Sequence, residues 1–164
     1  MFKLACDTSS IQYLHQTGLL HILQELGETI CIPPAVGKEL EEGRRKGVDL
    51  PDWNQIPWIQ LAHPEGEKDT RLLCDMGPGE AEVMMLALEE GGFVAVLDDA
   101  VARRRAALLE IPFTGTLGIL LDAKRKGLIH KIKPVLDQFH SLQFHLAEST
   151  RNMILRKAGE STHT

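Results

Sequence analysis

The strongest constraint in this sequence is a repeated alternation between short, largely apolar runs and amphipathic stretches of helical length. The clearest apolar runs are residues 2–6, 29–32 and 93–97. None of them alternates polar and apolar side chains, so each fits a strand buried on both faces, as in a parallel sheet covered by helices. We therefore predict an α/β fold: a three-layer α/β/α sandwich with a central parallel sheet of four to five strands and right-handed crossovers.

Apolar spacing, glycine and proline place the remaining elements. Apolar residues recur at helical spacing from Ile11 to Leu26, and Gly27 is expected to end that stretch. The other expected elements are helices at 35–45, 80–90, 100–109 and 117–126, strands near 58–61 and 111–113, and two helical stretches within 134–157 around a short strand at Leu142–Phe144.

Length and composition are those of one globular domain. The chain has 164 residues, of which 43% are hydrophobic and 25% are charged. We assign residues 1–158 to a single domain and residues 159–164 to a short polar tail. No apolar run approaches the roughly 18 residues of a membrane span, and Asp7 comes before any signal-peptide apolar region. The expectation is a soluble, cytoplasmic protein without membrane contact.

Charge and cysteine content restrict the partners and the compartment. The net charge is −5, so binding to a polyanion would need local basic patches or bound cations. Cys6, Cys31 and Cys74 are widely spaced and form no C-x-x-C motif. They indicate buried thiols in a reducing compartment rather than disulfides or a zinc site.

Acidic residues follow the predicted strands. Asp7 comes directly after the first strand, and Asp98 and Asp99 come directly after the strand that ends at position 97. Glu39 lies about one helical turn past the second strand, and Glu80 begins a helix after a Gly-Pro-Gly turn. Because parallel strands end at one edge of the sheet, these carboxylates should converge there. Such a group can bind Mg²⁺, which supports phosphoryl chemistry.

Each acid also has a simpler interpretation when taken alone. Asp7 and the Asp98–Asp99 pair could be helix N-caps, and Glu80 could complement a helix dipole. Glu39 could be one more solvated acid in a Lys-Glu-Leu-Glu-Glu run. The convergence of four separate elements on one edge favours a site.

Four further residues are candidates for substrate binding. Arg103 begins a run of three arginines, which could grip phosphate or a partner's acids, or form a solvated helix face. Thr114 and Thr116 could cap a helix or present hydroxyls to phosphate. Ser9 has no His and Asp at a spacing that would make it a nucleophile, so we consider it only as a residue that could bind substrate.

An ordered set of motifs resembles the PIN-domain ribonucleases. The motifs are Asp7-Thr8-Ser9-Ser10, Pro-Pro-Ala-Val-Gly-Lys-Glu-Leu at 33–40, Gly-Pro-Gly-Glu-Ala-Glu at 77–82, Leu97-Asp98-Asp99 with Ala102-Arg103, and segments 115–120 and 126–129. The similarity as a whole spans about residues 3–158. The set is similar to VapC-type toxins of bacterial and archaeal toxin–antitoxin pairs, in the branch with a Gly-Glu-Ala-Glu third-acid motif.

The resemblance implies a Mg²⁺- or Mn²⁺-dependent ribonuclease. Asp7, Glu39, Glu80 and one of Asp98 or Asp99 would be its catalytic and metal-binding carboxylates, and RNA would be its substrate. A small antitoxin protein and a second copy of the chain, forming a homodimer, are the expected partners. Two departures are visible: Glu80 replaces a more common Asp, and the residue before Asp98 is Leu rather than a common Thr.

Other functions also cluster acids on such a fold. An aspartyl-phosphate phosphatase would need an Asp two residues after the first, where this chain has Ser9. A receiver domain would need a Lys after the strand at Phe113, and none follows. A catalytically weak PIN-like module that binds nucleic acid or protein remains the alternative.

Overall fold

The centre of the molecule is a five-stranded parallel sheet in a computed structural model that describes residues 2–66, 75–89 and 92–163. The strand order is β3 (Ile59–Leu61), β2 (Gly27–Ile32), β1 (Phe2–Cys6), β4 (Phe93–Val96) and β5 (Phe113–Thr114). All four strand pairings are parallel. The first strand of the chain therefore occupies the middle of the sheet, and the predicted α/β/α architecture is confirmed.

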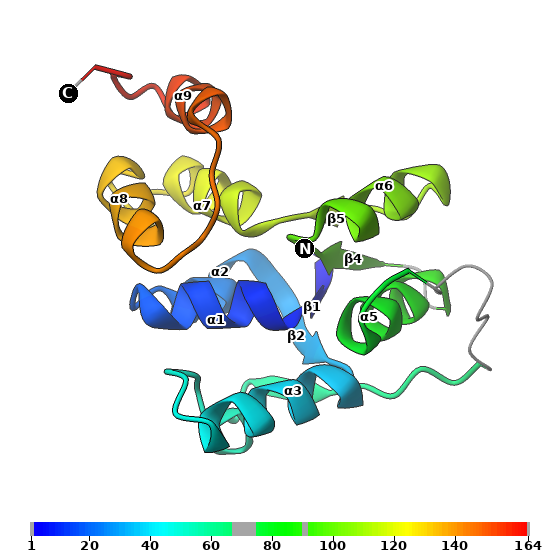
Figure 1. Cartoon of the computed structure of the whole chain (residues 1–164). Helices are drawn as coiled ribbons and strands as arrows, with labels where there is room; N and C mark the ends of the chain where they lie inside the picture. The colour runs from blue at the N-terminus through cyan, green and yellow to red at the C-terminus, as the bar shows by residue number, and fades with distance from the viewer. Residues whose placement is uncertain (1, 67–74, 90–91, 164) are drawn as a thin grey trace.

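Helices cover both faces of this sheet (Figure 1). The elements are α1 (Thr8–Gln16), η1 (Leu20–Ile22), α2 (Leu23–Leu26), α3 (Pro34–Arg45), η2 (Trp53–Gln55), α5 (Pro78–Glu89), α6 (Ala100–Leu108), α7 (Thr116–Arg125), α8 (Lys133–Ser141) and α9 (Glu148–Lys157). On one side α1, α2 and α7 pack together, whereas α5 and α6 pack together on the other side. Helix α3 contacts both α1 and α5, and α9 packs on α7.

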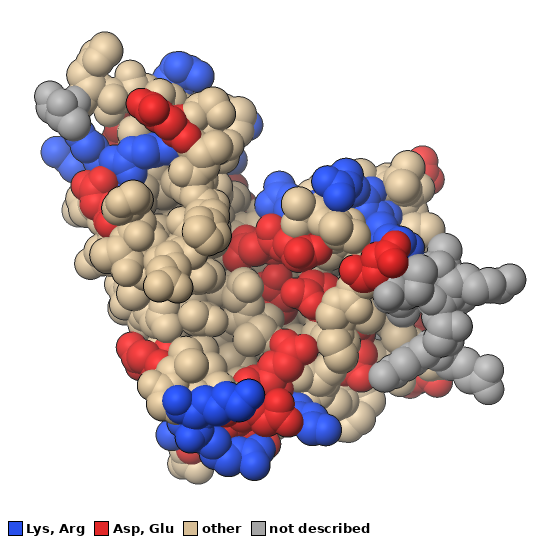
Figure 2. Space-filling view, in the orientation of Figure 1, with Lys and Arg blue, Asp and Glu red and all other residues tan. Residues whose placement is uncertain are grey.

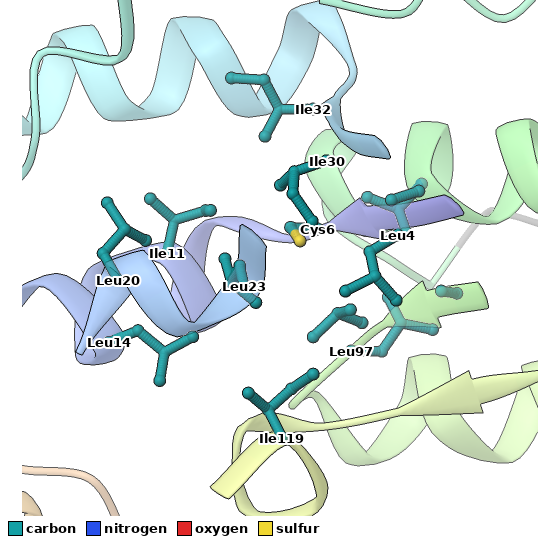
Figure 3. Packing of buried hydrophobic residues seen from close by; sticks show 14 of the residues in the cluster. Leu4, Cys6, Ile11, Leu14, Leu20, Leu23, Ile30, Ile32, Leu97 and Ile119 are labelled. Carbon is teal, nitrogen blue, oxygen red and sulfur yellow. The ribbon is translucent and has the colours of Figure 1, made fainter. Parts of the chain in front are cut away.

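The core between the sheet and the α1–α2–α7 layer fixes where these helices begin. Leu4 and Ile30 from neighbouring strands, Ile11 from α1 and Ile119 from α7 are all buried in one cluster (Figure 3). Burying side chains of this size stabilises the fold by about 1.5–3 kcal/mol each. The packing therefore holds the first turns of α1 and α7 at the carboxyl edge of the sheet.

The helical stretch expected from Ile11 to Leu26 is interrupted in the structure. Helix α1 ends at Gln16, where the Thr17 hydroxyl donates to the Tyr13 carbonyl at 2.7 Å and Gly18 adopts φ +73°. Gly27 ends the helical stretch as predicted, since it is the C-cap of α2; it is extended, with φ −119°, and also begins β2. A Cβ on Gly27 would lie 2.8 Å from the Ile30 side chain and 2.9 Å from that of Leu4, so glycine permits the close packing of the two strands.

The strand expected at Leu142–Phe144 was wrong. Helix α8 ends at Ser141, and Gln143 adopts a left-handed φ of +64°. The Phe144 N–H then donates to the Phe139 carbonyl at 3.0 Å, and the two rings stack with centroids 4.8 Å apart. Apolar residues that read as a short strand are thus the closing turn of a helix.

No helix within residues 2–66, 75–89 and 92–163 is long and apolar enough to cross a membrane. Cys6 and Cys31 are buried, as expected. The expectation for Cys74 falls outside the residues that the structure describes.

Candidate active site

The predicted acids lie at the carboxyl edge of the sheet, where α1, α5, α6 and α7 begin. Asp and Glu side chains gather at the centre of this face, with Lys and Arg side chains over α6 on one side and over α3 on another (Figure 2). We call Asp7 and Asp98 the inner pair, and Glu39, Glu80 and Asp99 the outer set. The two groups are held in different ways.

Asp7 links the ends of the two central strands. It is the N-cap of α1, and its Oδ1 accepts the Ser10 N–H at 2.9 Å. Its Oδ2 accepts the Asp98 N–H, also at 2.9 Å, from the end of β4. The residue is 1% exposed. Asp7 is therefore a helix N-cap, and the same carboxylate also links the start of α1 to the end of β4.

Asp98 is fixed by the start of α7. Its Oδ1 accepts the Thr116 N–H at 2.8 Å and its Oδ2 accepts the Thr116 hydroxyl at 2.6 Å. Among the described residues neither predicted threonine hydroxyl caps α7, whose N-cap is Gly115. The Asp98 carboxylate instead accepts the backbone N–H at the start of α7. Thr116 thus lies at the site, whereas the Thr114 hydroxyl is directed at Gly118 in the first turn of α7.

Burial and like charge raise the pKa values of the inner pair. Burial is the main cause that raises the pKa of Asp7 from 3.8 to about 7; the charge of Asp98 adds to it, and hydrogen bonds from Ser10 and Asp98 oppose it. Burial also raises the pKa of Asp98, against the opposing effects of Thr116 and Arg103. Two carboxylates whose charges repel each other favour either protonation of one of them or a nearby cation.

The outer set is held by contacts between helices. The Glu39 carboxylate, on α3, accepts hydrogen bonds from the Thr8 hydroxyl and, at 3.1 Å, from the Gly79 N–H at the start of α5. Burial raises the pKa of Glu80, and the charges of Glu39 and Asp99 raise it further. Asp99 is exposed and caps α6 through the Ala102 N–H at 2.9 Å.

The adjacent acids after β4 therefore face different neighbours. The charge of Asp98 acts on Asp7, whereas the charge of Asp99 acts on Glu80. In the structure Asp98 is thus the acid that pairs with Asp7, and Asp99 lies nearer Glu80.

The remaining predicted residues differ in how near they come to the carboxylates. Arg103 lies over the Phe113 ring at 5.3 Å, donates to the Leu97 carbonyl at 3.4 Å, and its charge lowers the pKa of Asp98. Ser9 makes no hydrogen bond to a carboxylate within the described part of the chain. Its two neighbours do so instead: Thr8 contacts Glu39 and Ser10 contacts Asp7.

The sequence interpretation missed Thr8 and Glu82 as contributors to this edge. Thr8 follows Asp7 directly, so its position in the first turn of α1 was a usable signal. Glu82 was part of a motif without an assigned role; it is 9% exposed, and its Oε2 accepts the Ala35 N–H at the start of α3 at 2.7 Å. Its place in the motif, two residues after Glu80, was the signal in the sequence; its burial became visible only in the structure.

The donor set fits a hard divalent cation. The side chains that converge here are carboxylates, and Mg²⁺ or Mn²⁺ prefers such oxygen ligands. A cation would also offset the repulsion that raises the pKa of Asp7. Within the described ranges no three His, Cys, Asp or Glu side chains already stand as a group that could hold a metal ion. Protein hydrogen-bond donors hold the carboxylates instead.

A parallel α/β sheet with buried and half-buried carboxylates at its carboxyl edge defines a class of domains suited to chemistry on phosphate esters. A family model described as a PIN domain matches residues 3–160, nearly the whole chain, and the protein belongs to this family. PIN domains are generally nucleases and typically use a divalent metal. No curated protein matches the chain.

Proposed function

We propose that this protein is a metal-dependent endoribonuclease that hydrolyses RNA phosphodiester bonds. The observation that carries the proposal is the pair formed by buried Asp7 and half-buried Asp98: the Asp98 N–H donates to the Asp7 carboxylate, and the two carboxylate charges repel each other. Burying two acids side by side costs stability unless a cation or a proton compensates them. A site that accepts this cost is one expected to bind a metal ion.

The inner pair and the outer set would supply the metal ligands. Asp7 and Asp98 are held rigidly, and Glu39 and Glu80 reach the same edge from α3 and α5, with Asp99 beside Glu80. A bound Mg²⁺ or Mn²⁺ supplies an activated water and stabilises negative charge on phosphate. Thr116 keeps both oxygens of Asp98 in place, and Ser10 and the Asp98 N–H keep Asp7 in place.

Basic side chains on the face that carries the acids support RNA as the substrate. Arg103, Arg104 and Arg105 lie on α6, and Arg44 and Arg45 lie in the last turn of α3. Figure 2 shows Lys and Arg over these two helices on the face that carries the acids. Local cations of this kind let an acidic protein contact a phosphate backbone.

A cleavage assay tests the proposal. Purified protein should cut single-stranded RNA with Mn²⁺ or Mg²⁺ and should lose this activity in EDTA. Asp137→Asn, which changes an exposed acid on α8 paired with Arg151, is the matched control and should cleave normally. RNA binding without cleavage in any divalent metal would instead favour a catalytically weak binding module.

We further propose that the protein acts as the toxin of a toxin–antitoxin pair and forms a homodimer. Exposed apolar side chains support a protein partner: Leu108 on α6 is 83% exposed and Phe2 is 62% exposed. Co-expression with the neighbouring reading frame should yield a hetero-complex, and light scattering of the isolated chain should give the mass of a dimer. A monomer that no neighbouring product binds would contradict the toxin role and leave the nuclease proposal intact.

A further inference from the structure

Helices α3 and α5 exchange carboxylates at their starting ends. Glu39 on α3 accepts the Gly79 N–H at the start of α5 at 3.1 Å. In return, Glu82 on α5 accepts the Ala35 N–H at the start of α3 at 2.7 Å. Each helix thus satisfies a backbone donor that the other leaves without an intrahelical partner.

The sequence explains why this exchange is needed. Helix α3 begins at Pro34, and its N-cap is Pro33, whose side chain makes no capping hydrogen bond. Glu82 is 9% exposed, and a nearly buried carboxylate requires such a partner. The positive end of the α3 dipole also favours a negative charge there. Glu82 is therefore placed where α3 needs an acceptor.

Glycine at the start of α5 makes the reverse contact possible. A Cβ on Gly79 would lie 2.8 and 2.9 Å from the two carboxylate oxygens of Glu39. Ala35 and Glu39 are four residues apart, so they lie one above the other on the same face of α3. Anchoring the Ala35 N–H consequently anchors the turn from which Glu39 extends.

We propose that Glu82 is a positioning residue for the metal site: it holds the start of α3 against α5 and thereby sets the reach of Glu39 toward Glu80. This inference rests on the proposed metal-dependent function. Glu82 acts through Glu39, and its own carboxylate is occupied by α3.

Calorimetric titration with Mn²⁺, without RNA, tests this role. The Kd should rise about 10-fold in Glu82→Ala, as is typical when a residue that orients a metal ligand is removed. Glu82→Gln keeps an oxygen acceptor for the Ala35 N–H, so the Kd should rise about 3-fold and the fold should be preserved. In a Glu39→Gln background, the same Glu82 substitutions should leave the remaining affinity unchanged.

Glu89→Gln is the matched control. Glu89 lies on the same helix and accepts the Glu65 and Gly66 N–H groups at 2.6 and 2.7 Å, away from the acidic edge. Its substitution should lower the melting temperature without changing the Mn²⁺ affinity. An equal loss of affinity in Glu89→Gln would overturn the proposal, because the effect would then be one of general stability.

Other outcomes separate this inference from the proposed function. If Glu82→Gln lowers affinity equally in the wild-type and Glu39→Gln backgrounds, Glu82 does not act through Glu39 and the proposal is overturned. Unchanged affinity in Glu82→Ala, with RNA cleavage intact in the wild type, overturns this inference alone. A wild-type chain that binds no Mn²⁺ and cleaves no RNA overturns the metal site and this inference together.

Discussion

The inner pair and the outer set of carboxylates are built by different parts of the fold. Asp7 and Asp98 have short side chains at the ends of β1 and β4, and backbone N–H groups and Thr116 hold them. Glu39 and Glu80 have longer side chains on α3 and α5, and contacts between helices hold Glu39. Sheet register therefore determines the inner pair, whereas helix packing determines the outer set.

This difference predicts unequal tolerance to change. Strand register can shift only in whole residues, so the inner pair is either correctly placed or lost. Helices can shift by fractions of an ångström, and Glu has one more rotatable bond than Asp, so the outer set can adjust. Substitutions in the two groups should differ in size, and four pairs of measurements can test the distinction.

The largest effect is expected from removing an inner carboxylate. Asp7→Asn should reduce metal-dependent RNA cleavage at least about 100-fold, because it removes a rigidly held metal ligand. Glu80→Gln should cost about 10-fold, since neighbouring oxygens and water can replace an adjustable ligand. Initial rates at saturating Mn²⁺, with Asp137→Asn as the control, measure both. Equal losses in the two variants would remove the distinction between inner and outer groups.

The metal-free protein should become less stable as the pH rises, because the inner pair loses the proton that the folded state binds more tightly than the unfolded state. Folded Asp7 has a pKa of about 7 against its ordinary 3.8, so between these values the folded state holds more protons than the unfolded state. The free energy of unfolding should therefore fall by about 2 kcal/mol between about pH 5 and about pH 7. The raised pKa values of Asp98 and Glu80 act in the same direction.

Urea unfolding in EDTA at several pH values measures this slope. Asp7→Asn should remove most of it, and Asp137→Asn should leave it unchanged. A free energy of unfolding that stays constant or rises over this interval would show that the pKa values of the inner pair are not raised in the folded state.

Removing the Thr116 hydroxyl that holds Asp98 should weaken Mn²⁺ binding about 10-fold. Thr116→Val removes the hydroxyl that donates to Asp98 Oδ2 at 2.6 Å, and it keeps the shape of the side chain. Thr114→Val is the matched control, because its hydroxyl faces Gly118 rather than a carboxylate. Comparable losses in both variants would mean that the hydroxyl does not act through Asp98.

The smallest effects should come from adding a single methyl group beside each carboxylate group. In Gly115→Ala the new Cβ would clash with Arg103 Nη1, which would have to shift. It would also lie 3.0 Å from Asp98 Oδ1 and 3.1 Å from the Leu97 carbonyl, and that backbone oxygen cannot move aside. The expected cost in unfolding free energy is about 1–2 kcal/mol. In Gly79→Ala the atoms met are the flexible end of Glu39. That change should cost less, about 0.5–1 kcal/mol, because Glu39 can move aside and gives up at most its hydrogen bond from the Gly79 N–H. Urea unfolding with Mn²⁺ removed compares the two.

The positions of the acids could largely be predicted from the sequence. Asp7, Asp98 and Asp99 directly follow apolar runs, and parallel strands must end at one edge, so their placement needs no tertiary detail. Glu39 and Glu80 followed from helix starts marked by proline and glycine. Local rules were enough wherever one element delivers one side chain.

The contacts between elements could not be predicted in the same way. Nothing in the spacing distinguishes Thr116, which holds Asp98, from Thr114, which does not, because both flank the start of α7 at Gly115. The exchange between Glu82 and Ala35 depends on how α3 packs against α5. The interrupted stretch after α1 and the false strand at Leu142–Phe144 also arose because apolar spacing alone does not show where a chain turns.

The central position of β1 has a consequence for how the protein is made. The hydrogen bond from the Asp98 N–H to Asp7 joins residues 91 positions apart, and Thr116 lies later still. Synthesis runs from the N-terminus, so Asp7 leaves the ribosome long before its partners do, and closing so long a loop delays pairing. A nascent or prematurely terminated chain that ends before α7 carries the first acid without the groups that hold the inner pair. Whatever chemistry depends on the inner pair can therefore begin only after synthesis has passed Asp98 and Thr116.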